Sequence, residues 1–134
     1  VDSHFFTPIV KSKKKFLFKN DFFPFKNKKT FFAMTGHIIF EDIDNKNTVT
    51  HSKKIIKIIR DRLRFKNILI SDDLSMKSLK GNLKDNIIKT FNAGCNLALH
   101  CNGNYKEMII IGKNSPQIDK FILKKTSQFY KILS

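Results

Sequence analysis

The stretch Ile68-Leu69-Ile70-Ser71-Asp72-Asp73-Leu74 decides the expected fold of this chain. The apolar run Ile68 to Ile70 is typical of a short buried strand, and the polar residues after it mark the strand's carboxyl-terminal end. Parallel α/β folds place catalytic residues at the carboxyl ends of their strands. The two aspartates are therefore the first candidates for chemistry.

Strands and helices alternate on both sides of this stretch. Strands are expected at residues 31–39, with a break near Gly36-His37, at 68–71 and at 96–101. Helices are expected at 52–64 with Ser52 as N-cap, at 85–92 followed by Gly94, at 106–112 and at 117–133. This order is the pattern of a parallel sheet with crossover helices, so the predicted fold class is α/β with about three parallel strands.

Length and cysteine content set the general class. The chain has 134 residues, of which 41% are hydrophobic, which fits one small domain or a piece of a larger one. No stretch approaches the roughly 18 uninterrupted apolar residues of a membrane span, and no signal peptide is expected, because Asp2 and His4 interrupt the start. The cysteines, Cys95 and Cys101, have neither metal-site nor redox-motif spacing. We therefore expect a reduced, cytoplasmic setting without a membrane partner.

The net charge of +15 suggests a nucleic-acid binder as the alternative function. Only Arg60, Arg62 and Arg64 are arginines among the 26 basic residues, although base readout and phosphate clamps favour arginine. The lysines are spread along the whole chain and are not gathered into one stripe. A basic, non-catalytic binding protein would thus bind nucleic acid weakly and without sequence preference.

Asp72 is a candidate nucleophile or base at the end of the central strand. The alternative is that one aspartate of the pair only caps the following helix. Adjacent carboxylates point in different directions, so Asp72 could face the site while Asp73 braces the turn. At the start of the chain, His4 is a candidate acid/base because Asp2 can orient an imidazole and stabilise its charged form, although an isolated histidine is more often structural.

The remaining histidines and cysteines are weaker candidates. His37, at the end of the first predicted strand, is a low-ranked substrate-binding candidate. We interpret His51 and His100 as structural or exposed, and Cys95 and Cys101 as small core residues. No residue set predicts a cofactor or a metal ion.

The chain resembles the bacterial beta-N-acetylhexosaminidases of glycoside hydrolase family 3, the cytoplasmic enzymes of peptidoglycan recycling, over residues 1 to about 133. The resemblance depends on the joint order and spacing of several short motifs. These are Asp2-Ser3-His4 with Pro8, Asp21-Phe22-Phe23-Pro24-Phe25, Ala33-Met34-Thr35-Gly36-His37-Ile38, Ile70-Ser71-Asp72-Asp73-Leu74-Ser75-Met76, Asn92-Ala93-Gly94-Cys95-Asn96 and Cys101-Asn102.

The resemblance implies that residues 1–134 are part of the catalytic domain of a retaining hydrolase, the carboxyl-terminal part of a TIM (β/α)8-type barrel. It assigns Asp72 as the nucleophile and His4 as the general acid/base, with Asp2 tuning His4. The implied substrate is an N-acetylglucosamine-containing muropeptide. Most retaining glycosidases use two carboxylates, so a His–Asp pair would here replace the second one.

The chain departs from the family pattern in two ways. The family's sugar-binding Lys-His-Phe-Pro-Gly-His-Gly stretch, which precedes the Asp-Ser-His motif, is absent, and about three of the eight strands of such a barrel remain. A missing amino-terminal half of the barrel is therefore an expected partner, and little turnover is expected from this stretch alone. Arg64 and Asn67 also replace family glycines in the turn before the nucleophile strand.

Overall fold

The computed structural model describes residue 2 and residues 5–133. His4, the candidate acid/base, lies outside the described residues. The elements in chain order are β1 (Ile9–Val10), α1 (Lys14–Lys19), the 3-10 helix η1 (Phe23–Phe25), β2 (Phe32–Met34), β3 (Ile39–Phe40), the 3-10 helix η2 (Val49–His51), α2 (Lys53–Asp61), β4 (Ile68–Asp73), α3 (Leu83–Ala93), β5 (Leu97–Leu99), α4 (Tyr105–Asn114) and α5 (Lys120–Leu133).

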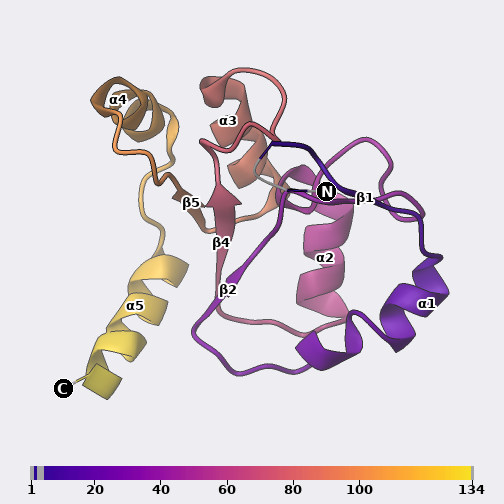
Figure 1. Cartoon of the computed structure of the whole chain (residues 1–134). Coiled ribbons are helices and arrows are strands. Elements are labelled where there is room, and N and C mark those ends of the chain that lie inside the picture. Colours follow the sequence, from indigo (N-terminus) through magenta and orange to yellow (C-terminus); the bar gives the residue numbers. More distant parts are fainter. Residues whose placement is uncertain (1, 3–4, 134) are drawn as a thin grey trace.

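A parallel three-stranded sheet with the order β2-β4-β5 forms the centre of the molecule (Figure 1). Phe32 pairs with Ile68 and Met34 with Ile70, so the first two predicted strands are neighbours and run in the same direction. The predicted α/β class with parallel strands is confirmed. The helices α2 and α3 pack on one face through Ile56 and Ala93, and together with Phe65 from the turn after α2 they bury Leu69.

The expected first strand is divided between two sheets. β2 ends at Met34, and β3 pairs in parallel with β1 in a separate two-stranded sheet. The physical reason is a change of hydrogen-bond partner: the Thr35 amide still donates to Ile70, whereas the Ile39 amide donates to Pro8 at 2.9 Å. The intervening turn directs the His37 ring into the interior, where it is buried.

The capping residues predicted for the start of α2 and the end of α3 are confirmed. The Ser52 hydroxyl accepts a hydrogen bond from the Ile55 amide at 3.2 Å, which satisfies one free donor at the start of α2. Gly94 ends α3 with φ of 115°, and a Cβ there would lie 2.9 Å from Ile56 Cγ2. Glycine at this position thus serves both the left-handed cap and the close packing of α2 on α3.

The turn between α2 and β4 departs from the expected helix, because α2 ends at Asp61 and not near residue 64. Arg64 has φ of 59°, a left-handed conformation that costs a residue with a Cβ about 1–2 kcal/mol. Asn67 is held differently, since its side-chain amide donates to the Thr30 carbonyl at 2.8 Å. Of the two positions where glycine was expected, only Arg64 carries backbone strain.

The sheet is open along β2, which pairs with β4 on one side only among the described residues. Near the amino ends of the strands, α5 places Phe129 against the rings of Phe31 and Phe32 at centroid distances of 5.5 and 5.2 Å. α4 lies at the other end, beyond β5 (Figure 1). No helix in the described part of the chain is long and apolar enough to cross a bilayer.

Replacing Arg64 by glycine is expected to raise the free energy of unfolding by about 0.5–1 kcal/mol, because the strain exceeds the entropy that glycine adds to the unfolded chain. Urea unfolding followed by circular dichroism measures the change. The comparison variant is Arg62→Gly: Arg62 has φ of −95°, so this change relieves no strain, adds the entropic cost, removes the contact of the guanidinium with the Phe18 ring and lowers stability. Equal effects of both substitutions would contradict the assignment of strain to Arg64.

Candidate active site

The carboxyl ends of β4 and β5 bring together most of the polar residues that the sequence singled out. Ile70 pairs with Leu97 and Asp73 with Leu99, so β4 contains one residue more than β5 between these pairs. This is a β-bulge, a feature that often redirects side chains beside active sites. β4 is also longer than expected, because it continues through Asp72 and Asp73.

The Asp73 carboxylate is fully engaged in bracing this end of the sheet. Its Oδ1 accepts from the backbone amides of Ser75 at 2.9 Å and Cys101 at 3.1 Å, and its Oδ2 accepts from the Ser75 hydroxyl at 2.7 Å. Burial alone raises the pKa of a carboxyl group, but these hydrogen bonds outweigh burial and hold the pKa of Asp73 below its usual value. Asp73 is therefore an ionised structural bridge between the ends of β4 and β5.

Asp72 has a different environment from its neighbour. It is half-buried, and its Oδ1 accepts one hydrogen bond, from the Asp73 amide at 2.9 Å. Its Oδ2 accepts no hydrogen bond from any side chain or backbone group in the described ranges. Of the two adjacent carboxylates, Asp72 thus retains an oxygen that is free to meet a ligand.

His37 lies beneath these carboxylates, with only 2% of its surface exposed. Its Nε2 is 2.9 Å from the Asp73 carbonyl, which can only accept, so the proton lies on Nε2. Nδ1 then accepts from the Thr50 hydroxyl at 3.0 Å, and Thr50 accepts from Thr35 at 2.9 Å. The ring that was predicted to bind substrate uses Nε2 to support the Asp73 carbonyl and Nδ1 to bond to the Thr50 side chain, so both nitrogens are engaged within the protein.

The amino-terminal segment crosses the loop that follows β4 (Figure 1). The Thr7 hydroxyl donates to the Ser78 carbonyl, and Lys77 Nζ lies 5.7 Å from the centroid of the Phe5 ring. Asp2 is exposed, and its carbonyl accepts from the amides of Phe5 and Phe6. Phe5 and Thr7, which follow the Asp-Ser-His motif in the sequence, therefore lie against the loop after β4.

Sequence reasoning missed the role of His100. The His100 side chain is 6% exposed, and its Nε2 lies 2.6 Å from Glu107 Oε2, which also accepts from Asn102 Nδ2 at 2.7 Å. The His100…Glu107 spacing from a strand end to the first turn of a helix is the signal that could have indicated the pair. The expectation that Cys101 is a core residue is wrong: Cys101 is exposed and lies in the turn after β5, which ends at Leu99.

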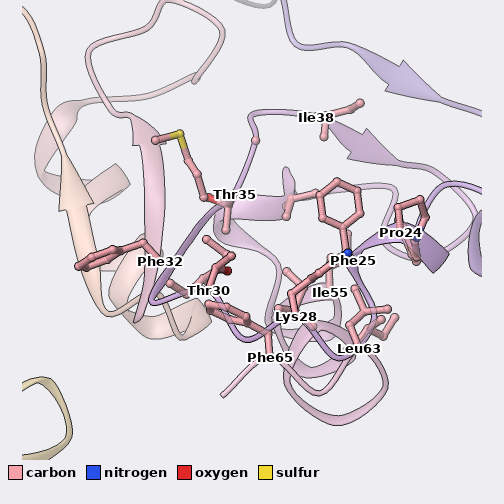
Figure 2. Close-up of a pocket in the computed structure, with 18 of the residues that line it drawn as sticks. Pro24, Phe25, Lys28, Thr30, Phe32, Thr35, Ile38, Ile55, Leu63 and Phe65 are labelled. Atoms are coloured by element: carbon pink, nitrogen blue, oxygen red, sulfur yellow. The ribbon is translucent and has the colours of Figure 1, made fainter. Parts of the chain in front are cut away.

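An apolar cavity lies on the helix side of β2, and neither Asp72 nor Asp73 lines it (Figure 2). It measures about 550 Å³ and is lined mainly by apolar side chains of η1, β2, α2 and the turn after α2, among them Phe25, Phe32, Ile55, Leu63 and Phe65. Apolar cavities lack the converging polar groups that bind and orient a sugar. We therefore interpret it as incomplete packing beside the open edge of β2 and not as the substrate site.

Other reactive groups in the described part of the chain are unsuited to catalysis. Cys95 is buried, and desolvation raises the pKa of its thiol to about 11, so the nucleophilic thiolate is scarce. No group of three or more His, Cys, Asp or Glu side chains among the described residues could hold a metal ion.

Comparison with known proteins identifies one family. The model of the glycosyl hydrolase family 3 N terminal domain matches residues 1–126. A beta-hexosaminidase of Actinobacillus pleuropneumoniae serotype 3 is 33% identical over 107 residues, which cover 75% of this chain and 31% of the relative. The beta-hexosaminidase of Psychromonas ingrahamii is 31% identical over 137 residues, which cover 98% of this chain and 39% of the relative. The chain thus spans about a third of the length of these curated relatives.

Solved structures agree on the fold. A glycoside hydrolase family 3 beta-N-acetylglucosaminidase from Paenibacillus sp. superposes with a TM-score of 0.80 at 18% identity and covers 98% of this chain and 27% of that structure. NagZ from Neisseria gonorrhoeae, in complex with N-trifluoroacetyl-D-glucosamine, superposes with a TM-score of 0.77 at 23% identity and covers 92% and 37% of the two chains. The prediction of a partial TIM-type barrel is confirmed.

The substitution His37→Phe is expected to lower the free energy of unfolding by about 1–2 kcal/mol. The change keeps an aromatic ring but removes the bonds of the ring to the Thr50 hydroxyl and the Asp73 carbonyl, which keep only their bonds to other groups. His37→Gln, whose amide can restore one of the two bonds, is the matched control and is expected to cost less. Urea unfolding measures both variants, and a loss below about 0.5 kcal/mol in His37→Phe would contradict the supporting role.

His51 is expected to make the fold sensitive to acid. Burial is the main cause that lowers the pKa of His51 from 6.5 to about 4, and the nearby positive charge of Lys89 adds to it. Between these values the unfolded chain binds a proton that the folded chain does not, so stability falls as the pH drops from about 6.5 to 4. For a half-buried ring screened by solvent we expect a loss of about 2 kcal/mol.

Thermal unfolding at several pH values tests this dependence. The variant His51→Gln cannot titrate, so the difference in stability between the wild type and this variant is expected to change across the same pH interval. A difference that stays constant from pH 7 to pH 4 would exclude His51 as the source.

Proposed function

Because this chain belongs to the glycosyl hydrolase family 3 N-terminal domain family, we propose that residues 1–134 form the carboxyl-terminal part of the catalytic barrel of a retaining beta-N-acetylhexosaminidase. The proposed reaction releases terminal beta-linked N-acetylglucosamine. The relatives named above are beta-hexosaminidases, and one structural relative is a beta-N-acetylglucosaminidase. This agreement supports the choice of reaction.

The observation that supports the proposal most directly is the contrast between the two aspartates. A nucleophile needs an ionised carboxylate with a free oxygen at the end of a barrel strand. Asp72 has such an oxygen, whereas Asp73 uses both of its oxygens to hold the turn. Asp72 is accordingly proposed as the nucleophile and Asp73 as its support.

The proposed reaction has two steps. Asp72 attacks the anomeric carbon, the glycosidic bond breaks, and the leaving oxygen takes a proton from the His4 imidazolium. His4 then accepts a proton from water while the water attacks the glycosyl ester, which releases the sugar and restores Asp72. Asp2, two residues before His4, is proposed to stabilise the charged imidazole.

The finer assignments are part of the same proposal. The substrate class is an N-acetylglucosamine-containing muropeptide from peptidoglycan recycling in the cytoplasm. His37 contributes to the substrate site indirectly, through the backbone of Asp73. The remaining barrel strands, from elsewhere in the same protein or from a separate polypeptide, supply the sugar-binding groups and cover the open edge of β2.

A chimera tests the role of Asp72. This chain replaces the matching segment of the Psychromonas ingrahamii beta-hexosaminidase, and release of a chromogenic aglycone from a beta-N-acetylglucosaminide is measured. Asp72→Ala is expected to reduce kcat roughly a thousandfold or more, because the covalent step is lost. Asp61→Ala, which removes only a surface ion pair with Lys57, is the control.

Normal turnover of the Asp72→Ala chimera would refute the nucleophile assignment. If the unsubstituted chimera is folded by circular dichroism but inactive, the proposed site is incompatible with a complete barrel. The isolated 134-residue chain is expected to show little or no turnover, because the groups that position the sugar are missing. A rate of about 1 per second or more for this chain would contradict the need for the other strands.

A further inference from the structure

The turn after β5 alternates its contacts between two neighbouring elements. Leu99 bonds to β4 through its amide, which donates to Ser71 Oγ at 2.9 Å, and the Cys101 amide donates to Asp73 Oδ1 at 3.1 Å. The residues between and after them face the other way, because His100 and Asn102 both bond to Glu107 on α4. One short turn therefore links the end of β4 to the start of α4.

Glu107 is a fixed anchor and not a freely moving surface carboxylate. It lies in the first turn of α4, where its backbone amide donates to the N-cap side chain of Asn104 at 3.3 Å. Asn102 Oδ1 in turn accepts from the Asn104 amide at 2.8 Å. A carboxylate in the first turn of a helix is also favoured by the helix dipole. The His100 ring thus bonds to a rigid partner in a largely buried position.

The position of the Cys101 amide depends on this anchor. Cys101 lies between His100 and Asn102, so the two bonds to Glu107 hold its amide in place on both sides. That amide is one of the donors that keep the Asp73 carboxylate engaged. Without the anchor, Asp73 loses a donor, and the backbone that carries Asp72 gains freedom.

We propose that His100 is a positioning residue for the candidate active site: its bond to Glu107 fixes the turn that braces Asp73 and thereby orients Asp72. The orientation of Asp72 matters for turnover only if the proposed hydrolase function holds. The bracing itself belongs to the folded chain and is independent of any substrate.

The ionisable groups around His100 determine how its bond to Glu107 responds to pH. Glu107 approaches it from α4, Asp73 from the end of β4, and the exposed Cys101 thiol follows it in the turn. Hydrogen bonds from His100 and then from Asn102 lower the pKa of Glu107. The anchor is therefore present above that lowered pKa and is lost as the pH falls through it.

Carboxyl titration by NMR on the isolated chain tests the proposal without any substrate. In His100→Leu, which removes the donor, the pKa of Asp73 is expected to rise by at least about 0.5 unit, a threefold change in proton affinity. Hydrogen exchange of the Cys101 amide is expected to become at least about tenfold faster. His100→Gln, whose amide can donate to Glu107, is expected to restore much of the protection.

Lys106→Gln is the matched control, since it removes a positive charge next to Glu107 but leaves the His100 contact intact. It is expected to leave both readouts unchanged. Unchanged readouts in His100→Leu, or an equal change in Lys106→Gln, would overturn the proposal. If His100→Leu does not fold, Glu107→Gln weakens the same bond from α4, and wild-type values for Asp73 and Cys101 in that variant would overturn it as well. If the chimera is inactive but the wild-type chain shows the expected carboxyl titration, the proposed hydrolase function is refuted and the positioning role of His100 is not.

Discussion

The two parallel hydrogen-bond ladders on β4 are the constraint on which the rest of the structure depends. β4 is the central strand and pairs with β2 on one side and β5 on the other. Its apolar residues Ile68 and Leu69 are almost completely buried, which commits the strand to one position. Because both ladders run in the same direction, the polar groups that end the three strands meet at one edge of the sheet. The site exists because β4 cannot shift its register without exposing Leu69.

The elements that could be predicted from the sequence are those whose signals lie within a few neighbouring residues. An apolar triplet followed by polar residues predicted β4, Ser52 predicted the start of α2, and Gly94 predicted the end of α3, since each signal acts within a few residues. The departure of Ile39 into a second sheet was not predictable in this way, because its partner Pro8 lies far away in the sequence. Strand pairing between residues that are far apart in the sequence cannot be read from the residues around either partner.

The site shows the same division. The position of Asp72 and Asp73 at a strand end followed from the local pattern, but their different environments did not. The Cys101 amide that engages Asp73 comes from the turn after β5, and the Asp73 carbonyl is supported by His37 from the turn after β2. The His100 and Glu107 pair has only a weak local signal, the spacing from a strand end to the first turn of the next helix, and this spacing does not show that the two side chains meet.

Incomplete packing beside β2 explains why a chain with a recognisable candidate site need not be active by itself. The apolar cavity of about 550 Å³ and the unpaired edge of β2 lie on the same side of the sheet. Met34 and Phe25 remain largely exposed there, so burial that would stabilise a closed barrel is missing. An open edge also offers unpaired backbone groups to any extended chain.

The polar edge and the apolar side place different demands on whatever completes the barrel. The bracing of Asp73 by Ser75, Cys101 and His37 is internal to the described residues, so the position proposed for the nucleophile is prepared in advance. The proposed catalysis depends on holding a sugar against that position, and we propose that the groups for this come from strands beyond β2. The added strands therefore have two separable tasks: apolar side chains that fill the cavity provide stability, and polar side chains at their carboxyl ends provide the substrate contacts. A strand that performed only the first task would stabilise the chain and leave it inactive.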